Sequence, residues 1–233
     1  MRTRLLALGA ATVLAAAALT GCVPVGPALS DSPEIGDVTG VVLNTGGSLT
    51  ISEGEPSLTI HAPQRLLAVL TTREDDGVLH LGRRAGPFTF AAGEIRYELT
   101  VPTLESIVVN GAGDIVSTVS GGDLTIEIRG TGDIDVAGID AGAVEVRIDG
   151  SGDVELAGTA DSLEIAIDGT GHVNADGLEV TDAVVQISGA GDARLHVTGT
   201  LRAELSGVGS VRHRGGARVE SEISGLGDVT LED

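Results

Sequence analysis

Gly150-Ser151-Gly152-Asp153-Val154-Glu155-Leu156 contains a four-residue pattern, Gly-x-Gly-Asp, that recurs through the second half of the chain. Seven copies can be aligned, two with His or Ser in place of Asp, and they begin at Gly111, Gly130, Gly150, Gly169, Gly189, Gly207 and Gly225. Successive copies start 18 to 20 residues apart. A period this regular indicates one supersecondary unit stacked on itself, so the repeat predicts a solenoid.

Each repeat carries two runs in which apolar and polar residues alternate, for example Val154 to Leu156 and Leu163 to Ile167. Alternation with period two is typical of a strand that is buried on one side. We expect the glycines to allow sharp turns between strands, often with positive φ. The predicted fold is all-β, a single-stranded parallel β-helix of about seven coils over residues 108–233.

Aligning the repeats places aliphatic residues in columns that we expect to stack inside the solenoid. The first column is Ile115, Ile134, Val154, Val173, Ala193, Val211 and Val229. The second is Ser117, Val136, Leu156, Ala175, Leu195, His213 and Leu231. The third is Val109, Ile128, Ile148, Ile167, Ile187, Leu205 and Ile223. Because no coil can bury its apolar side alone, the stack should fold cooperatively.

Polar positions in the repeat give two further expectations. Outward residues of neighbouring coils should form ion pairs, Glu127 with Arg147 and Arg129 with Asp149, which would fix the register more than the stability. Ser117 and His213 interrupt an inward column. We expect His213 to be a hydrogen-bonded or partly exposed histidine near the open end of the stack, not a ligand.

Residues 34–107 lack the repeat but keep strand patterns between Gly, Pro and Asn. Five segments show them, namely residues 41–43, 49–51, 58–60, 78–81 and 95–101. We interpret this region as less regular strands that extend or cap the N-terminal end of the solenoid and protect it from edge pairing. The last strand, at Asp228 to Glu232, has no evident cap, so we expect a monomer protected by its terminal acids or a self-associating chain.

The composition excludes one class of partner. Lysine is absent, aromatic residues make up 1% of the 233 residues, and the formal net charge is −20. Binding to nucleic acid needs clustered positive charge, so we exclude nucleic acid as a partner. The core must be built from Val, Ile, Leu and Ala.

The N-terminus has the features of an export signal. Arg2 and Arg4 precede an apolar run from Leu5 to Leu19, which is too short for a comfortable membrane span. Residues 19–22, Leu-Thr-Gly-Cys, resemble the bacterial lipoprotein box. The resemblance implies a signal peptide over residues 1–21 and acylation of Cys22, the only cysteine, which would anchor the protein at the cell membrane. The alternative is a signal peptide cleaved elsewhere, with Cys22 incidental. Residues 22–33, rich in Pro, Gly and Ser, are expected to be a flexible tether.

The junction between the two halves resembles a known family. Leu99-Thr100-Val101-Pro102, Leu104 to Val109 and Asn110 to Asp114 look like the bacterial GIN-domain family, the auto-transporter adhesin head domain. The similarity covers about residues 35–230. It implies an exported, β-helix-like domain that is often tethered to the envelope, and it supplies no catalytic residues to transfer.

The turn aspartates are candidates for cation binding. They are Asp114, Asp133, Asp153, Asp192 and Asp228. The pattern is similar to the calcium-binding nonapeptide β-roll, but the period here is twice as long. The simpler interpretation is that these carboxylates hydrogen-bond turn amides. The alternative hypothesis is weak binding of divalent cations to the stacked acids.

We predict no enzyme activity and no cofactor. An outward pair such as Asp135 and Glu155 could act on a sugar, and a cleft containing Tyr97 would favour that function. Against it, sugar sites usually offer aromatic platforms, and the repeat region has none. The predicted function is therefore a non-catalytic binding, adhesion or scaffold module that contacts an envelope protein or polymer. The alternative is a carbohydrate-active or carbohydrate-binding β-helix.

Overall fold

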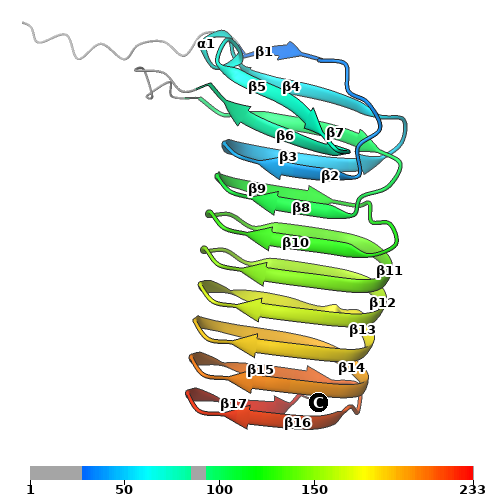
Figure 1. The fold of residues 1–233 in the computed structure, drawn as a ribbon, viewed down its shortest axis with the longest axis vertical. Coiled ribbons are helices and arrows are strands. Elements are labelled where there is room, and N and C mark those ends of the chain that lie inside the picture. The colour runs from blue at the N-terminus through cyan, green and yellow to red at the C-terminus, as the bar shows by residue number, and fades with distance from the viewer. Residues whose placement is uncertain (1–27, 85–92, 233) are drawn as a thin grey trace, which may run out of the picture.

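The computed structural model describes residues 28–84 and 93–232 (Figure 1). They form a β-solenoid of about six turns, which confirms the predicted fold class. The predicted signal peptide and Cys22 lie outside the described residues. Within the described ranges, no helix has the length and apolar character needed to cross a membrane.

Each coil of the repeat region contributes strand to two faces of the solenoid. Face A consists of β8 (Ser106–Val109), β10 (Leu124–Ile128), the C-terminal halves of the four long strands and β16 (Arg218–Ile223). Face B consists of β9 (Ala112–Ser117), the N-terminal halves of the long strands, β15 (Val208–Arg214) and β17 (Leu226–Leu231). The long strands are β11 (Ile134–Ile148), β12 (Val154–Ile167), β13 (Thr170–Ile187) and β14 (Ala190–Leu205). All these pairings are parallel, as expected for successive windings.

The predicted aliphatic columns form the core. Ile134, Val154 and Val173 are register partners in adjacent coils, and each is at most 1% exposed. Burial ends at the last coil, where Ile223 is 42% exposed because nothing described covers it. The core is therefore a continuous aliphatic stack that is open at its C-terminal end.

The glycines of the repeat serve close packing between turns. A Cβ atom on Gly150 would lie 2.0 Å from the carbonyl oxygen of Gly130, and one on Gly152 would lie 1.9 Å from that of Gly132. Of the fourteen glycines in the seven motifs, only Gly132 and Gly209 have positive φ. The expectation that positive φ selects these glycines is thus mostly wrong. They are required because the turn of the preceding coil occupies the space of a side chain.

The first coil in sequence is not the first in the stack. β2 (Gly40–Leu43) lies between β6 (Val78–Arg83) and β8, and β3 (Gly46–Glu53) lies between β7 (Arg96–Val101) and β9. The chain therefore forms this coil inside the stack before it turns back to build the N-terminal end. It then passes the first coil and continues into the repeats.

Antiparallel strands and a short helix complete that end. β5 (Leu70–Asp75) pairs with β6, and β4 (Ser57–Pro63) pairs with β7. The helix α1 (Gln64–Leu67) lies at this end, at the top of Figure 1. All five predicted segments form strands, but β2 and β3 lie inside the stack, whereas β4, β6 and β7 build its N-terminal end.

The expected tether differs from the structure in part. Residues 28–31 form β1 (Ala28–Asp31), which pairs antiparallel with β4. The expectation of a flexible segment is wrong for these four residues, because their backbone groups add a strand to the cap. Residues 22–27 lie outside the described ranges.

Candidate functional site

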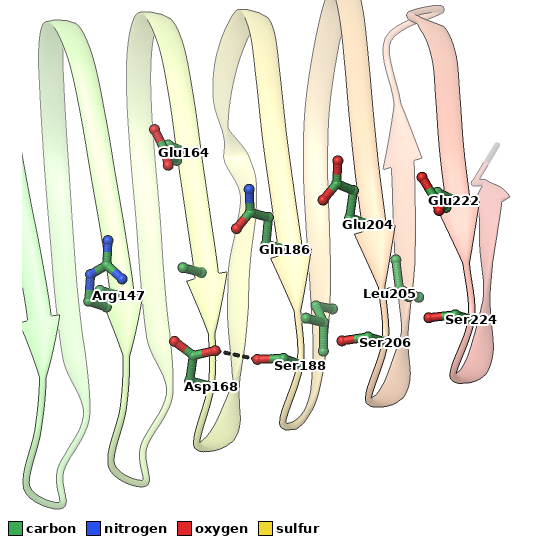
Figure 2. Close-up of a pocket in the computed structure, with 12 residues that line it drawn as sticks. Arg147, Glu164, Asp168, Gln186, Ser188, Glu204, Leu205, Ser206, Glu222 and Ser224 are labelled. Carbon is green, nitrogen blue, oxygen red and sulfur yellow. Dashed lines mark hydrogen bonds between the residues drawn. The ribbon is translucent and has the colours of Figure 1, made fainter.

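A shallow groove lies on face A near the C-terminal end of the stack (Figure 2). It has a volume of about 270 Å³ and crosses five coils, from β11 to β16. Its lining residues are Arg147, Glu164, Ala166, Asp168, Gln186, Ile187, Ser188, Glu204, Leu205, Ser206, Glu222 and Ser224. The lining is dominated by hydroxyl, amide and carboxylate groups, so the groove offers hydrogen bonds rather than an apolar surface.

One column of the groove is regular. Ser188, Ser206 and Ser224 each follow the last residue of a face A strand, one in each successive coil. The hydroxyl of Ser188 donates a hydrogen bond to Asp168 in the preceding coil (Figure 2). Adjacent parallel strands are about 4.8 Å apart. The column therefore presents hydrogen-bonding groups at roughly that interval along the solenoid.

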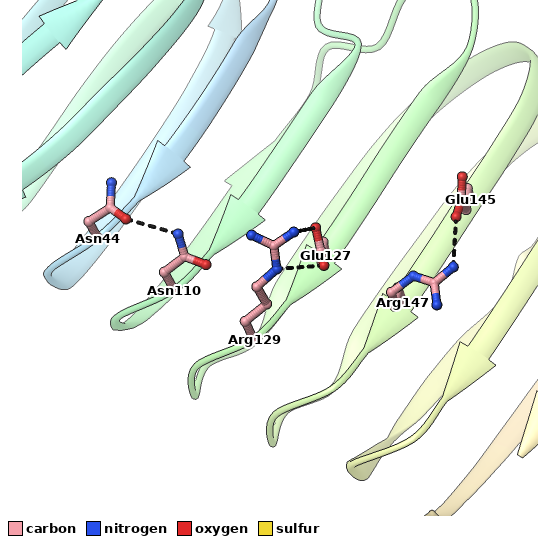
Figure 3. A network of polar contacts seen from close by, with 6 residues as sticks. All are labelled: Asn44, Asn110, Glu127, Arg129, Glu145 and Arg147. Atoms are coloured by element: carbon pink, nitrogen blue, oxygen red, sulfur yellow. Dashed lines mark hydrogen bonds and ion pairs between the residues drawn. The ribbon is translucent and has the colours of Figure 1, made fainter. Parts of the chain in front are cut away.

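Two arginines on face A form ion pairs within their own coil (Figure 3). Arg129 Nε lies 2.6 Å from Glu127 Oε1, and Arg147 Nη2 lies 3.3 Å from Glu145 Oε1. The hydrogen bond to Glu145 is the main cause that raises the pKa of Arg147. Residues two apart on a strand point to the same side, and a guanidinium is long enough to bridge them.

The predicted pairs between coils are wrong. Glu127 and Arg147 are register partners, as expected, but each takes its ion-pair partner from its own strand. The same holds for Arg129, which we expected to pair with Asp149. The repeat places the residues correctly, while side-chain reach selects the partner.

The turn aspartates connect neighbouring coils through the backbone. Oδ1 of Asp114, Asp133 and Asp153 each accepts a hydrogen bond from the backbone amide of the equivalent residue in the next coil, at 2.8 to 3.1 Å. The expectation that these carboxylates bind turn amides is confirmed for them, and the amide belongs to the following coil.

Asp192 makes the strongest of these contacts. Its Oδ1 accepts from the Ser210 amide at 2.8 Å and from the Ser210 hydroxyl at 2.6 Å. The hydroxyl hydrogen bond is the main cause that lowers the pKa of Asp192. Asp228 makes no side-chain hydrogen bond to any described residue.

The aspartate edge borders a second, open concavity of about 450 Å³ that includes Asp114, Asp133, Asp153 and His172. Within residues 28–84 and 93–232, no three His, Cys, Asp or Glu side chains are grouped to hold a metal ion. Cation binding at this edge stays a prediction.

The acids considered for sugar chemistry lie side by side, but neither the groove nor an aromatic platform lies with them. Asp135 and Glu155 are register partners on face B, away from the groove. Tyr97 is 1% exposed and its hydroxyl has no described hydrogen-bond partner, so it offers no platform to a ligand.

The two interruptions of the inward column differ from each other. The Ser117 hydroxyl donates to the Val119 carbonyl at 2.9 Å and accepts from the Val119 amide at 3.1 Å. His213 is 6% exposed, and its Nδ1 has no hydrogen-bond partner among the described residues. The expectation of a hydrogen-bonded or partly exposed His213 is wrong, because the side chain follows its column into the core. Burial lowers its pKa.

The sequence identifies the class to which this solenoid belongs. The family described as "Putative auto-transporter adhesin, head GIN domain" matches residues 37–217. The chain belongs to this family of bacterial adhesin-like domains, and the predicted resemblance is confirmed at that level. No curated protein matches the sequence.

Solved structures with the same fold are distant in sequence. A "putative adhesin" from Bacteroides fragilis superposes with a TM-score of 0.83 at 23% identity, covering 88% of this chain and 97% of that one. A "putative lipid binding protein" from Parabacteroides distasonis gives 0.70 at 18% identity, covering 89% and 98%. A "putative adhesin" from Parabacteroides merdae gives 0.68 at 20%, covering 89% and 97%. These structures consist almost wholly of the matched solenoid, which indicates that it folds as a unit.

Proposed function

We propose that this protein is an exported lipoprotein, held at the cell membrane through Cys22, whose solenoid is a non-catalytic adhesion or scaffold module. The anchor is supported by the lipoprotein box at residues 19–22 and by the single cysteine. The binding role is supported by membership in an adhesin-head family. We choose the contact surface on one observation, which is that a groove with hydrogen-bonding groups crosses five coils of face A.

The groove favours an extended partner over a compact small molecule. It is shallow, and its serine column repeats over three successive coils, so a ligand with evenly spaced polar groups can bind along its length. An envelope polymer or an extended protein segment has this character. The buried Tyr97 and the absence of aromatic residues from the groove lining argue against a sugar site built on stacking.

Capture from envelope extracts tests the binding role. Residues 23–233 are immobilised and compared with the double variant Ser188→Arg, Ser206→Arg, which fills the groove with long cationic side chains. We expect the variant to lose at least tenfold of the captured material. The matched control is Thr159→Arg, Thr181→Arg, at exposed positions outside the groove. Equal capture by all three proteins would contradict the assignment of the groove.

Treatment of the extract separates polymer from protein. Protease digestion that abolishes capture identifies a protein partner, and periodate oxidation that abolishes it identifies a carbohydrate. The second result would support the carbohydrate-binding alternative.

Metabolic labelling tests the anchor. Cells that express the full chain and are fed labelled palmitate should incorporate label into the protein and retain it in the membrane fraction. Cys22→Ser should remove both the label and the retention. Label and retention that both persist in the variant would indicate that Cys22 is incidental.

A further inference from the structure

Face B carries a column of charges that changes sign along the solenoid. In register, one residue per coil, the column reads Asp135, Glu155, Asn174, Arg194 and Arg212. Three of the four charged residues are exposed and Arg212 is half-buried. None of the four forms an ion pair or a side-chain hydrogen bond with any described residue. This contrasts with Arg129, Arg147 and Arg202 on face A, each of which is paired within its coil.

The arrangement costs energy in the isolated chain. Asp135 and Glu155 are adjacent like charges, as are Arg194 and Arg212, at an interstrand spacing of about 4.8 Å. Glu155 and Arg194 have opposite charge but are separated by a whole coil, about 10 Å, which is too far for an ion pair. No residue of the column therefore has a counter-charge beside it within the column, although Asp192 in the neighbouring column lies close enough to Arg212 for the two charges to interact.

A second copy of the chain, related by a two-fold rotation axis, can supply counter-charges to the column. If an axis parallel to the strands passes through the level of Asn174, a second copy lies face to face with its solenoid reversed. Glu155 then faces Arg194 of the second copy, and Asp135 faces Arg212 of the second copy. The sequence of charges, two acids, a neutral amide and two arginines, is self-complementary only in this antiparallel register.

We propose that face B is a self-association surface, and that two copies of this chain pair antiparallel about Asn174. Five coils of about 4.8 Å and five residues of about 3.3 Å give roughly 400 Å² on each copy. An interface of this size is weak and transient, so we expect dissociation constants on the order of 100 μM.

The neighbouring column on face B, formed by the turn aspartates, fits this pairing in part. Its acids Asp114, Asp133 and Asp153 lie in the same half of face B as Asp135 and Glu155, which strengthens the difference between the two halves. One contact is unfavourable, because Asp153 faces Asp192 of the second copy. Both carboxylates already accept hydrogen bonds in their own chain, and Arg212 helps to lower the pKa of Asp192.

The orientation has a consequence for the proposed anchor. With each N-terminus held at a membrane, reversed solenoids are reached most directly by copies from two facing surfaces. Many weak pairs would then act together. This consequence depends on the proposed function, whereas the pairing itself does not.

Charge exchange tests the pairing with purified residues 23–233 by sedimentation equilibrium. The native sequence should dimerise at a few hundred micromolar in low salt and dissociate as salt is added. Arg194→Glu, Arg212→Glu makes the column wholly acidic, and Asp135→Arg, Glu155→Arg makes it wholly basic. Each variant alone should be monomeric, and an equimolar mixture should form heterodimers. The mixture also shows that both variants are folded.

A matched control and a covalent probe complete the test. Arg147→Glu, Arg202→Glu makes the same charge change on face A and should leave dimerisation unchanged. Residues 23–233 contain no cysteine, so the variant Asn174→Cys has a single thiol. This variant should oxidise to a disulfide-linked dimer, whereas Gln186→Cys on face A should not. A native protein that stays monomeric at 500 μM (about five times the expected constant), or a mixture that does not associate, overturns the proposal. The charge-exchange variants and Asn174→Cys leave the groove of face A unchanged, so the pairing can fail independently of the proposed function.

Discussion

Gly169 lies directly against Gly150 of the preceding coil, so closely that a Cβ atom on Gly169 would come within 2.0 Å of the Gly150 carbonyl oxygen. The same contact recurs at each turn of the repeat, because the hydrogen bond from the Thr170 amide to the Gly150 carbonyl fixes the two turns at 2.9 Å. The backbone itself therefore excludes side chains at this position.

Gly169→Ala should destabilise the solenoid. The added methyl group meets backbone, which cannot move away without breaking the hydrogen bonds between coils, so we expect a loss of about 3 kcal/mol in the free energy of unfolding. Urea denaturation followed by circular dichroism measures it. The control is Gly82→Ala, where the nearest atom is a side-chain oxygen, Thr71 Oγ1, at 3.2 Å. Similar losses in both variants would show that the close contact is not the cause.

Removing one turn carboxylate should weaken the junction between two coils. Asp153→Ala deletes the acceptor of the His172 amide, a hydrogen bond of 2.8 Å, and we expect a loss of about 1 kcal/mol. Asp153→Asn keeps an acceptor oxygen and should retain most of the stability. Asp161→Ala, at an exposed position without a described side-chain hydrogen bond, is the control. If Asp153→Asn is as unstable as Asp153→Ala, the charge rather than the hydrogen bond is responsible.

The repeat region could be predicted almost completely from sequence, because one period fixes both the strand positions and the inward columns. Ile134, Val154 and Val173 were placed together by spacing alone, and they are register partners. Side-chain pairing could not be predicted in the same way. The period determines that Glu127 lies beside Arg147, but rotamers determine that each binds a residue of its own strand.

The threading of the first coil was missed, although the sequence contains a signal for it. Thr45-Gly46-Gly47-Ser48 is a degenerate copy of the turn, and Gly47 is the register partner of Gly113. Asn44 and Asn110 precede the two turns and hydrogen-bond each other at 2.9 Å (Figure 3). The separation of 66 positions between these asparagines hides the period, so spacing alone does not reveal the match.

Stability should depend on pH through Asp192. The Ser210 hydroxyl lowers the pKa of Asp192 below its ordinary value of 3.8. A group with a lowered folded-state pKa stabilises the protein above its unfolded pKa, and this contribution is lost as the pH falls below about 4. Ser210→Ala should therefore melt at a lower temperature than the native protein at pH 7. The difference should shrink at pH 3. A difference that is the same at both pH values would assign the loss to packing at Ser210.

His213 should make the stability depend on pH in a higher pH range than Asp192 does. Its burial among apolar residues lowers its pKa, so the unfolded chain takes up a proton first as the pH falls through 6.5, and stability decreases there. His213→Leu restores the column formed with its register partners Leu195 and Leu231. It also removes the unpartnered Nδ1. We expect this variant to gain about 1 kcal/mol at pH 7 and to lose less stability between pH 7 and pH 5 than the native protein.

His172→Asn, at an exposed position, is the control and should leave both quantities close to native. Thermal melts at the two pH values measure both effects. A variant less stable than the native protein would mean that the imidazole makes a favourable contact in the core.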